Sequence, residues 1–383
     1  MDKPSSTRKV NASPDAILQY GGQAVIEGVM MRSPRYFAVA CRKPDGGIVV
    51  QCEDVDKSII GKLKWLNWPF ARGTLALIDA MALGIKALAF ASNVQMGTGP
   101  VEAPSESGSV GGTTQHGLKE EAEATGASIV GSAPIAGSAA GGVAMPASGK
   151  INDVAIGGTI VFSILFGLGL FVLLPTAITG LLTHLHLTGT NQHGLAMRLN
   201  VADGVIRMFI FFCYILLISR MDNIKRVFQY HGAEHKAINT LEAGLPLNES
   251  NALKASRIHP RCGTSFIFVV LIINIIVFAF LPRPQFLPYR FLEHLAVIPF
   301  VAGVAYEVTK MAGKYRHVPL VMTLLAPGMA TQYLTTREPD ETQVEVALAA
   351  LLSVLAAEGH LESDSINVAG DVVDSLEPAA AIA

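Results

Sequence analysis

The sequence predicts a polytopic α-helical membrane protein of about four spans, with a small N-terminal antiparallel β unit and a C-terminal amphipathic helix. Three observations predict this class. Half of the 383 residues are apolar and only 16% are charged, a composition more typical of membrane proteins than of soluble enzymes. Several apolar runs are long enough to cross a bilayer. The four cysteines are widely scattered, which argues against a disulfide framework and favours a cytoplasm-facing protein.

The net charge argues against a nucleic-acid-binding protein, and the N-terminal sequence argues against a secreted one. The net charge of −2 gives no sign of a nucleic-acid-binding surface. The lipid bilayer is the partner expected from the apolar runs. The polar start Met1–Ser6 lacks an apolar core, so we expect no signal peptide. We expect residues 1–18 to be disordered.

Residues 19–95 are predicted to form a β unit followed by a helix. The β-prone runs are Gln23–Met31, Phe37–Arg42 and Ile48–Cys52. The last two runs are separated by Lys43–Gly47, whose Asp-Gly step tolerates the positive φ that a tight turn needs. We therefore expect a small antiparallel β unit.

The helix predicted after the β unit covers Gly73–Ser92, which is nearly all apolar except for Asp79 and Lys86. These two charges are seven residues apart, or two helical turns, and so share one face. We expect an amphipathic helix that lies on the membrane or on the β unit. A membrane span is the alternative, because twenty residues are long enough to cross.

Residues 96–150 are rich in Gly, Ser, Ala and Thr and show no hydrophobic periodicity. This composition is typical of a flexible linker, because it offers too little apolar surface to offset the entropy of ordering.

Residues 151–336 form the predicted membrane domain. A fifth apolar run, Val318–Leu334, contains Pro327 and Gly328, which we expect to break a helix, so a re-entrant or interfacial segment is favoured there. The four predicted spans are Ile156–Leu182, Val205–Ser219, Ser265–Leu281 and Phe291–Val308.

Lysine and arginine counts in the connectors predict the orientation. The connector 220–264 holds seven such residues, whereas the connector 183–202 holds one. The positive-inside rule therefore places the 220–264 connector and both termini in the cytoplasm of a multi-pass cell membrane protein, by expectation the bacterial inner membrane.

Residues 337–383 are predicted to form a soluble amphipathic helix and a disordered tail. Pro339 followed by acidic residues is typical of a helix start. Gly359 is expected to end the helix. Apolar residues between these points recur at helical spacing: Val344, Leu348, Leu351, Leu352 and Leu355.

The chemistry of the chain is expected in the 220–264 connector. His231 and His235 are one helical turn apart, with Glu234 beside them. His-x-x-Glu-His is also the inverted signature of zinc peptidases, in which the glutamate acts on a metal-bound water. His259 and Cys262 follow in the same connector, around a Pro-Arg pair that predicts a bend. Imidazole and thiolate donors favour Zn²⁺.

Two designs of this site remain open. If all four residues hold the metal, the site is structural and Glu234 is an outer partner. If three hold it, a coordination position stays open and Glu234 is the candidate general base. Glu242, seven residues after His235, is ~10 Å further along the axis and suits an outer role better than a ligand role. A third interpretation has no metal, with Cys262 as a small buried side chain.

Three other polar features have structural interpretations. We expect Tyr230 to anchor the chain at the membrane interface. Glu27 lies in an apolar β-prone run and is expected to pair with an arginine such as Arg32 or with a backbone turn. The run Thr335–Glu338 is expected to be a helix cap with its salt bridge.

Four separated motifs together resemble the bacterial YqhQ-like family, membrane proteins of uncharacterised function that are labelled predicted metal-dependent enzymes. The resemblance covers about residues 18–95 and 150–357. The motifs are Gly21–Arg32, Tyr230–Lys236, His259–Ser265 and Thr335–Pro339. The resemblance implies a membrane protein with a metal-dependent activity.

Two functions follow from these observations. The first is a membrane-embedded metal-dependent enzyme, with Zn²⁺ at His231, His235, His259 and Cys262 and with Glu234 as the base for hydrolysis of a membrane-proximal peptide or lipid bond. The second is a non-catalytic membrane scaffold whose β unit and tail helix recruit cytoplasmic partners. A transporter is disfavoured, because no paired broken helices are found.

Overall fold

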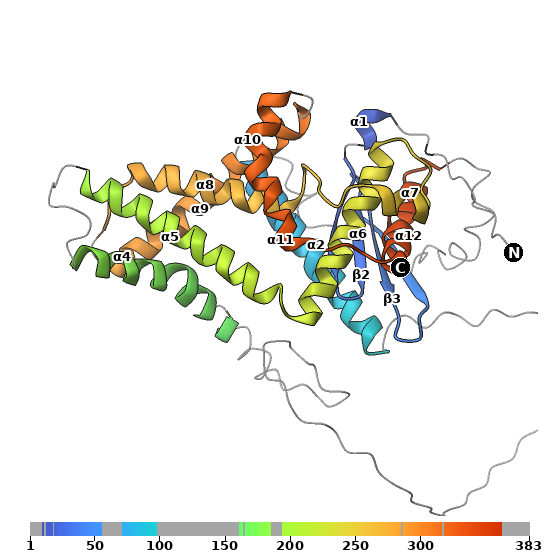
Figure 1. The fold of residues 1–383 in the computed structure, drawn as a ribbon, viewed down its shortest axis with the longest axis horizontal. Coiled ribbons are helices and arrows are strands. Elements are labelled where there is room, and N and C mark those ends of the chain that lie inside the picture. The colour runs from blue at the N-terminus through green and yellow to red at the C-terminus, as the bar shows by residue number, and fades with distance from the viewer. Residues whose placement is uncertain are drawn as a thin grey trace, which may run out of the picture.

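The computed structural model combines a small α/β unit with a bundle of long apolar helices (Figure 1). The predicted linker from residue 98 onward and the tail beyond residue 361 lie outside the described residues. Of the predicted disordered N-terminus, Pro14–Ile17 forms the short helix α1 instead. The structure describes residues 10, 13–17, 19–55, 71–97, 161–163, 165–184, 194–284, 286–315 and 318–361.

A four-stranded antiparallel sheet in the order β1-β2-β3-β4 forms the centre of the α/β unit. The predicted run Gln23–Met31 is two strands rather than one, because the chain turns at Glu27, whose φ is +51°. The apolar neighbours of Glu27 hide this turn in the sequence. The strands are β1 Gly21–Val25, β2 Gly28–Arg32, β3 Tyr36–Arg42 and β4 Ile48–Asp54.

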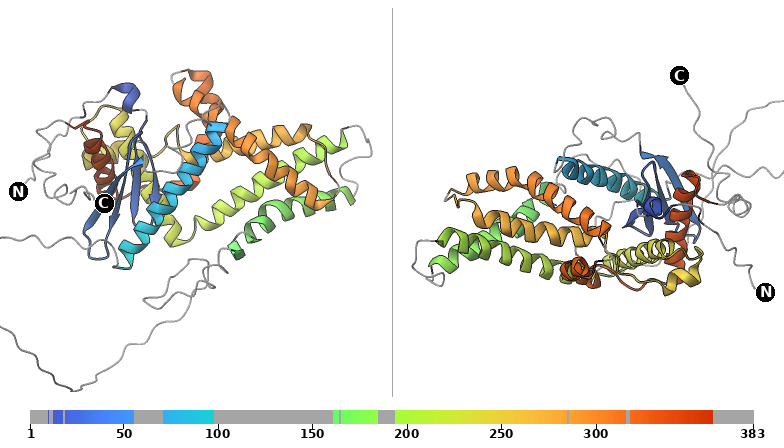
Figure 2. Two further views of the ribbon diagram at one scale, coloured as in Figure 1. Left: turned by 180° about the vertical axis from the view of Figure 1, so that it is seen from behind. Right: turned by 90° about the horizontal axis from the view of Figure 1, so that it is seen from above.

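The two faces of the sheet bury different helices, as the alternation of side chains along a strand requires. Met31 and Ala38 face the helices α6 (Asp222–Glu242) and α12 (Glu341–Ala357). The other face packs against α2 (Ala71–Gln95). Figure 2 shows α2 and α12 on opposite sides of the sheet.

Two charged side chains of α2, Asp79 and Lys86, tie the helix to the sheet. Asp79 is buried and pairs with Arg32 of β2, and Lys86 lies 3.9 Å from Glu53 of β4. Arg32, given as an example of an arginine partner for Glu27, pairs with Asp79 instead. The first turns of α2 lie on the bundle instead, where the Thr74 hydroxyl donates to the Pro299 carbonyl.

Five described helices are long and apolar enough to cross a membrane: Gly73–Gln95, Val161–His184, Leu195–Ile218, Gly263–Phe280 and Pro288–Met311. The second contains a π-helical turn, η4 (Gly169–Leu173), followed by α4 (Leu174–His184). Helix α5 (Leu195–Ile218) lies between α4 and α8 (Gly263–Phe280), and α9 (Leu287–Lys314) packs on α8. This arrangement supports a membrane protein.

The fifth apolar run folds as two short helices. Helix α10 (Pro319–Ala330) continues through Pro327, and a turn at Thr331, whose backbone angles remain helical, separates it from α11 (Gln332–Thr335). The break was expected at Pro327 and Gly328 and falls a few residues later.

The 220–264 connector is mostly helical. Helix α6 directly follows α5, and a turn at Gly244, with φ +65°, leads to α7 (Glu249–Lys254). Tyr230 of α6 is fully buried in the core of the α/β unit, so its predicted role as an interfacial anchor was wrong. Its apolar ring packs with the sheet and α12 rather than meeting a bilayer surface.

Helix α12 begins later than predicted. Asp340 is its N-cap and forms a capping box with Gln343, so Pro339 precedes the helix instead of starting it. Leu348, Leu351 and Leu355 are buried against the sheet and α6. Glu358 then bonds Ser33 and Arg35 beside β3.

Residues 335–339 cross α6 at Gly232, where the two backbones come unusually close. A Cβ at Gly232 would lie 2.1 Å from the Arg337 carbonyl oxygen. The crossing is fixed by the Arg337 N–H, which donates to the Phe228 carbonyl at 2.8 Å. Glycine is therefore the residue that this crossing permits.

We predict that Gly232→Ala lowers the free energy of unfolding by about 1–3 kcal/mol, because the added methyl group overlaps backbone that cannot move cheaply. Thermal unfolding of the detergent-solubilised chain measures the change. Gly180→Ala in α4 is the control, since nothing lies within 4 Å of a Cβ there. Equal melting temperatures for Gly232→Ala and the unchanged chain would contradict the close crossing.

Candidate metal centre

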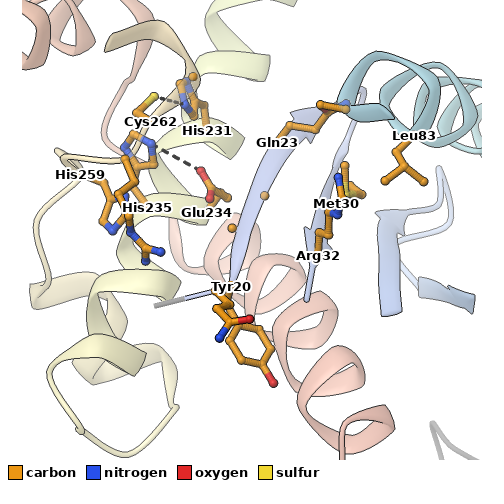
Figure 3. Close-up of a pocket in the computed structure, with 16 residues that line it drawn as sticks. Tyr20, Gln23, Met30, Arg32, Leu83, His231, Glu234, His235, His259 and Cys262 are labelled. Carbon is orange, nitrogen blue, oxygen red and sulfur yellow. Dashed lines mark hydrogen bonds and ion pairs between the residues drawn. The ribbon is translucent and has the colours of Figure 1, made fainter. Parts of the chain in front are cut away.

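A cavity of about 280 Å³ lies where α6, the edge strand β1, α2 and the start of α8 meet. Figure 3 shows His231, Glu234, His235, His259 and Cys262 together on one side of β1. Every predicted site residue therefore lines one cavity. The fold brings them together because α6 packs along β1 and the bend at 259–262 returns the chain to α6.

Three of the predicted ligands form a compact group. One donor atom each from His231, His235 and Cys262 lies within 4.8 Å of the others. The two histidines are one turn apart on α6, and Cys262 is the N-cap of α8. The Cys262 Sγ is 3.3 Å from Nε2 of His231.

Main-chain carbonyls fix both imidazoles. His231 Nδ1 lies 2.8 Å from the Thr335 carbonyl, and His235 Nδ1 lies 2.6 Å from the Arg257 carbonyl. Because a carbonyl oxygen only accepts, each Nδ1 carries the proton. Each Nε2 is then left with a lone pair, which for His231 points at Cys262. Metal-binding histidines in proteins are usually held in this way.

His259 lies beside this group but is held by another partner. Its Nε2 is 3.1 Å from a Glu242 carboxylate oxygen, which also pairs with Arg261. The His259 ring centre is 5.7 Å from that of His235. The four-residue set expected from the sequence is thus divided into three converging donors and one neighbour. Glu242 lies outside the three-donor group, where it contacts His259 and Arg261.

The Glu234 carboxylate is buried on the wall of the cavity. One oxygen lies 3.5 Å from Nε2 of His235, and the carboxylate accepts the Gly22 N–H. Burial raises the pKa of Glu234, and the nearby His231, His259 and Arg261 partly oppose that rise. Burial also lowers the pKa of His235, so a neutral imidazole is favoured there.

Sequence reasoning missed the part that Gly22 plays. A Cβ at this position would lie 2.9 Å from Glu234 Cγ and 2.5 Å from the Met30 carbonyl oxygen. The absence of a side chain lets β1 approach α6 closely enough for the N–H to reach Glu234. The adjacent glycines 21 and 22 before a β-prone run were the available signal.

The run Thr335–Glu338 was predicted to be a helix cap with its salt bridge; it leads from the end of α11 toward α12, and Glu338 does form salt bridges. The Thr335 carbonyl orients His231, and Glu338 pairs with the buried Lys236 at 2.7 Å. The same lysine donates to the carbonyls of Leu253 and Ala255. These bonds hold the α7 region against α6.

Glu27 binds a different arginine from the one expected. It pairs with Arg226 of α6, and the Tyr230 hydroxyl donates to it at 3.2 Å. This pairing joins the β1–β2 turn to α6 one turn before the histidines.

The donor set fits a zinc ion. Two imidazoles and one thiolate are ligands that Zn²⁺ prefers. Because each Nδ1–H is bonded to a main-chain carbonyl, the Nε2 atoms are the ones that remain to bind a metal. Three protein ligands are also the number found in catalytic zinc sites, whereas structural sites have four.

Comparison with known proteins identifies relatives but no activity. Residues 68–357 match the family described as "Protein of unknown function (DUF1385)". The chain is 32% identical to the "Uncharacterized protein YqhQ" of Bacillus subtilis (strain 168), over 90% of this chain and 95% of that protein. No solved structure matches the chain.

We predict that the purified chain carries about one zinc ion, and that His231→Ala and Cys262→Ala remove it. His259→Ala is expected to keep most of the metal, because His259 is bonded to Glu242. Elemental analysis of each variant at matched folding measures the outcome. A His231→Ala protein with full zinc occupancy would rule out the three-donor site.

Proposed function

We propose, for a chain that belongs to the DUF1385 family of proteins of unknown function, that it is a multi-pass membrane protein with a metal-dependent hydrolase centre facing the cytoplasm. The supporting observation is the convergence of His231, His235 and Cys262, with both imidazoles oriented from behind, beside the buried carboxylate of Glu234.

The residues of the chain have separate roles in this proposal. Bound zinc would polarise the scissile group and make water more acidic. Glu234 is the general base, because its raised pKa suits a group that takes a proton from water and returns it to the leaving group. The Gly22 N–H holds this carboxylate in place. Thr335 and Arg257 hold the imidazoles through their carbonyls.

We expect the substrate bond to lie near the membrane surface. The cavity is lined by residues of α2 and by Gly263, where the apolar helix α8 begins. A peptide or lipid bond at that level fits the position of the site.

The proposed topology has four crossings, formed by the 161–184 segment, α5, α8 and α9. Both termini and the 220–264 connector are cytoplasmic in this topology, in agreement with seven Lys and Arg in that connector against one in 183–202. Helix α2 remains at the surface, because Leu83, Ala87 and Ala91 are buried against the sheet.

A membrane scaffold with a structural metal is the second candidate. Deep burial of the donors favours it, since His235 is only 1% exposed and Cys262 only 5% exposed. In this case the metal would join α6 to the start of α8, and the α/β unit would recruit cytoplasmic partners.

We predict that Glu234→Gln keeps the metal and the fold but lowers hydrolysis by about 10²–10⁴-fold, because a general base is removed. The measurement is the initial rate of the zinc-loaded, liposome-reconstituted chain on a panel of peptide, carboxyl ester and phosphoester substrates. Asp222→Asn, on an exposed position of the same helix, is the control. If Glu234→Gln retains the rate, or the unchanged chain hydrolyses nothing in the panel, the scaffold is favoured.

We also predict that a cysteine placed at Ser250 is labelled by an impermeant maleimide only after the inner membrane is opened. A cysteine placed at Phe286 should be labelled in intact spheroplasts, because the connector between α8 and α9 faces the other side. The experiment uses a chain whose native cysteines are replaced by alanine. Labelling of both positions from the same side would exclude the four-crossing topology.

A further inference from the structure

The ends of α4, α5, α8 and α9 come together at the end of the helical bundle away from the sheet (Figure 1). A group of charged side chains from α5, α9 and the α8–α9 connector lies there. Asp203 of α5 is at its centre and is only 3% exposed. Its carboxylate pairs at 3.0 Å with both Arg207 and Arg290. Charged groups buried between the helices of a membrane bundle are costly and usually have a function.

A third arginine joins this group, and among the described residues no carboxylate forms an ion pair with it. Arg283, just beyond the end of α8, donates to Oδ1 of Asn200 at 3.0 Å and to the Thr179 hydroxyl at 3.1 Å. Both acceptors are neutral. Arg290 is close enough to repel both Arg207 and Arg283 electrostatically, and Nε of Arg207 is buried without a hydrogen-bond partner.

Positive charge is in excess at this end of the bundle. Around Asp203 the charged side chains include Arg207, Arg283 and Arg290, and Glu293 lies near Arg290, so three positive groups face two negative ones. A guanidinium group does not lose its proton in proteins, so the excess cannot be removed by titration. An anion from outside the chain can neutralise it in a medium of low dielectric.

The size of the cavity in this group decides where an anion can bind. The space between Asn200, Arg207 and Asn274 is about 10 Å³, which holds about one water molecule. A phosphate group is too large for it. Arg283 is only half-buried, so the anion must bind at the outer edge, where Arg283 lies.

The depth of the group in the membrane indicates the source of the anion. Phe278, at the end of α8 that bonds Asn200, is 16 residues after Cys262, or about 24 Å along a helix. That length is close to the ~30 Å of a bilayer core. If the metal centre lies at one membrane surface, Arg283 therefore lies at the level of the phosphates of the other leaflet.

We propose that Arg283, supported by Arg290 and Arg207, binds the phosphate group of an anionic phospholipid at the surface opposite the metal centre. The site depends on the proposed crossing of α5, α8 and α9 but not on the metal or on catalysis. Lipid bound there stabilises the packing of these helices, because it neutralises arginines that otherwise repel one another.

The experiment is thermal unfolding of the full chain in a nonionic detergent with phosphatidylglycerol, with diacylglycerol, or with inorganic phosphate. Phosphatidylglycerol at about 100 times its Kd is expected to raise the melting temperature of the unchanged chain by about 5 °C. Diacylglycerol should give no rise, because it lacks the phosphate. A full rise with inorganic phosphate alone would show a free-anion site and overturn the lipid assignment.

The variants make the assignment specific. Arg283→Gln keeps donors for Asn200 and Thr179 but removes the charge, and should abolish the rise. Arg198→Gln, at an exposed position on the same end of the bundle, removes the same charge and should keep the rise. An equal rise in Arg283→Gln, or no rise in the unchanged chain, would overturn the proposal.

A second measurement needs no variant. Native mass spectrometry of the chain purified in mild detergent should show a phospholipid adduct that survives removal of zinc with a chelator. Absence of this adduct from the unchanged chain would count against the lipid site. Zinc content, measured in the same preparation before the chelator is added, tests the metal centre separately.

Discussion

The crossing of residues 335–339 over α6 is the constraint on which the site depends. It requires glycine at position 232, where any side chain would overlap the Arg337 carbonyl. Because the backbones are this close, the Thr335 carbonyl accepts a hydrogen bond from Nδ1 of His231, and Glu338 forms an ion pair with Lys236. The same crossing leads the chain to α12, which closes the core over β2 and β3. The orientation of one imidazole and the closure of the core therefore depend on the same backbone approach.

Ion pairs between distant segments hold the rest of the α/β unit together. Glu27 joins the β1–β2 turn to α6, Asp79 joins α2 to β2, and Glu358 joins the end of α12 to Arg35. Each pair includes at least one largely buried or half-buried group, so breaking it would leave a charge with poor solvation. His231 and His235 of α6 are thus held between the sheet on one side and the 257–262 segment on the other.

The sequence predicted the features that repeat locally. Long apolar runs identified the bundle, alternation and an Asp-Gly turn identified part of the sheet, and the i, i+4 spacing identified His231 and His235. Contacts between distant segments were not predictable in this way. A carbonyl such as that of Thr335 has no residue-type signature, and the preference of His259 for Glu242 depends on how the 245–258 segment folds back. Glu27 was misplaced because apolar neighbours conceal its turn.

The order of synthesis has a consequence for how this protein matures. The core of the α/β unit combines β2, α6 and α12, which are drawn from the beginning, the middle and the end of the chain. Val10 even forms a bridge with Leu361. Helix α2 follows the sheet in the chain and covers one face, whereas the opposite face, which carries Met31 and Ala38, is completed only by α6 and finally by α12. That face of the sheet therefore lacks its last covering helix until almost the whole chain has been synthesised.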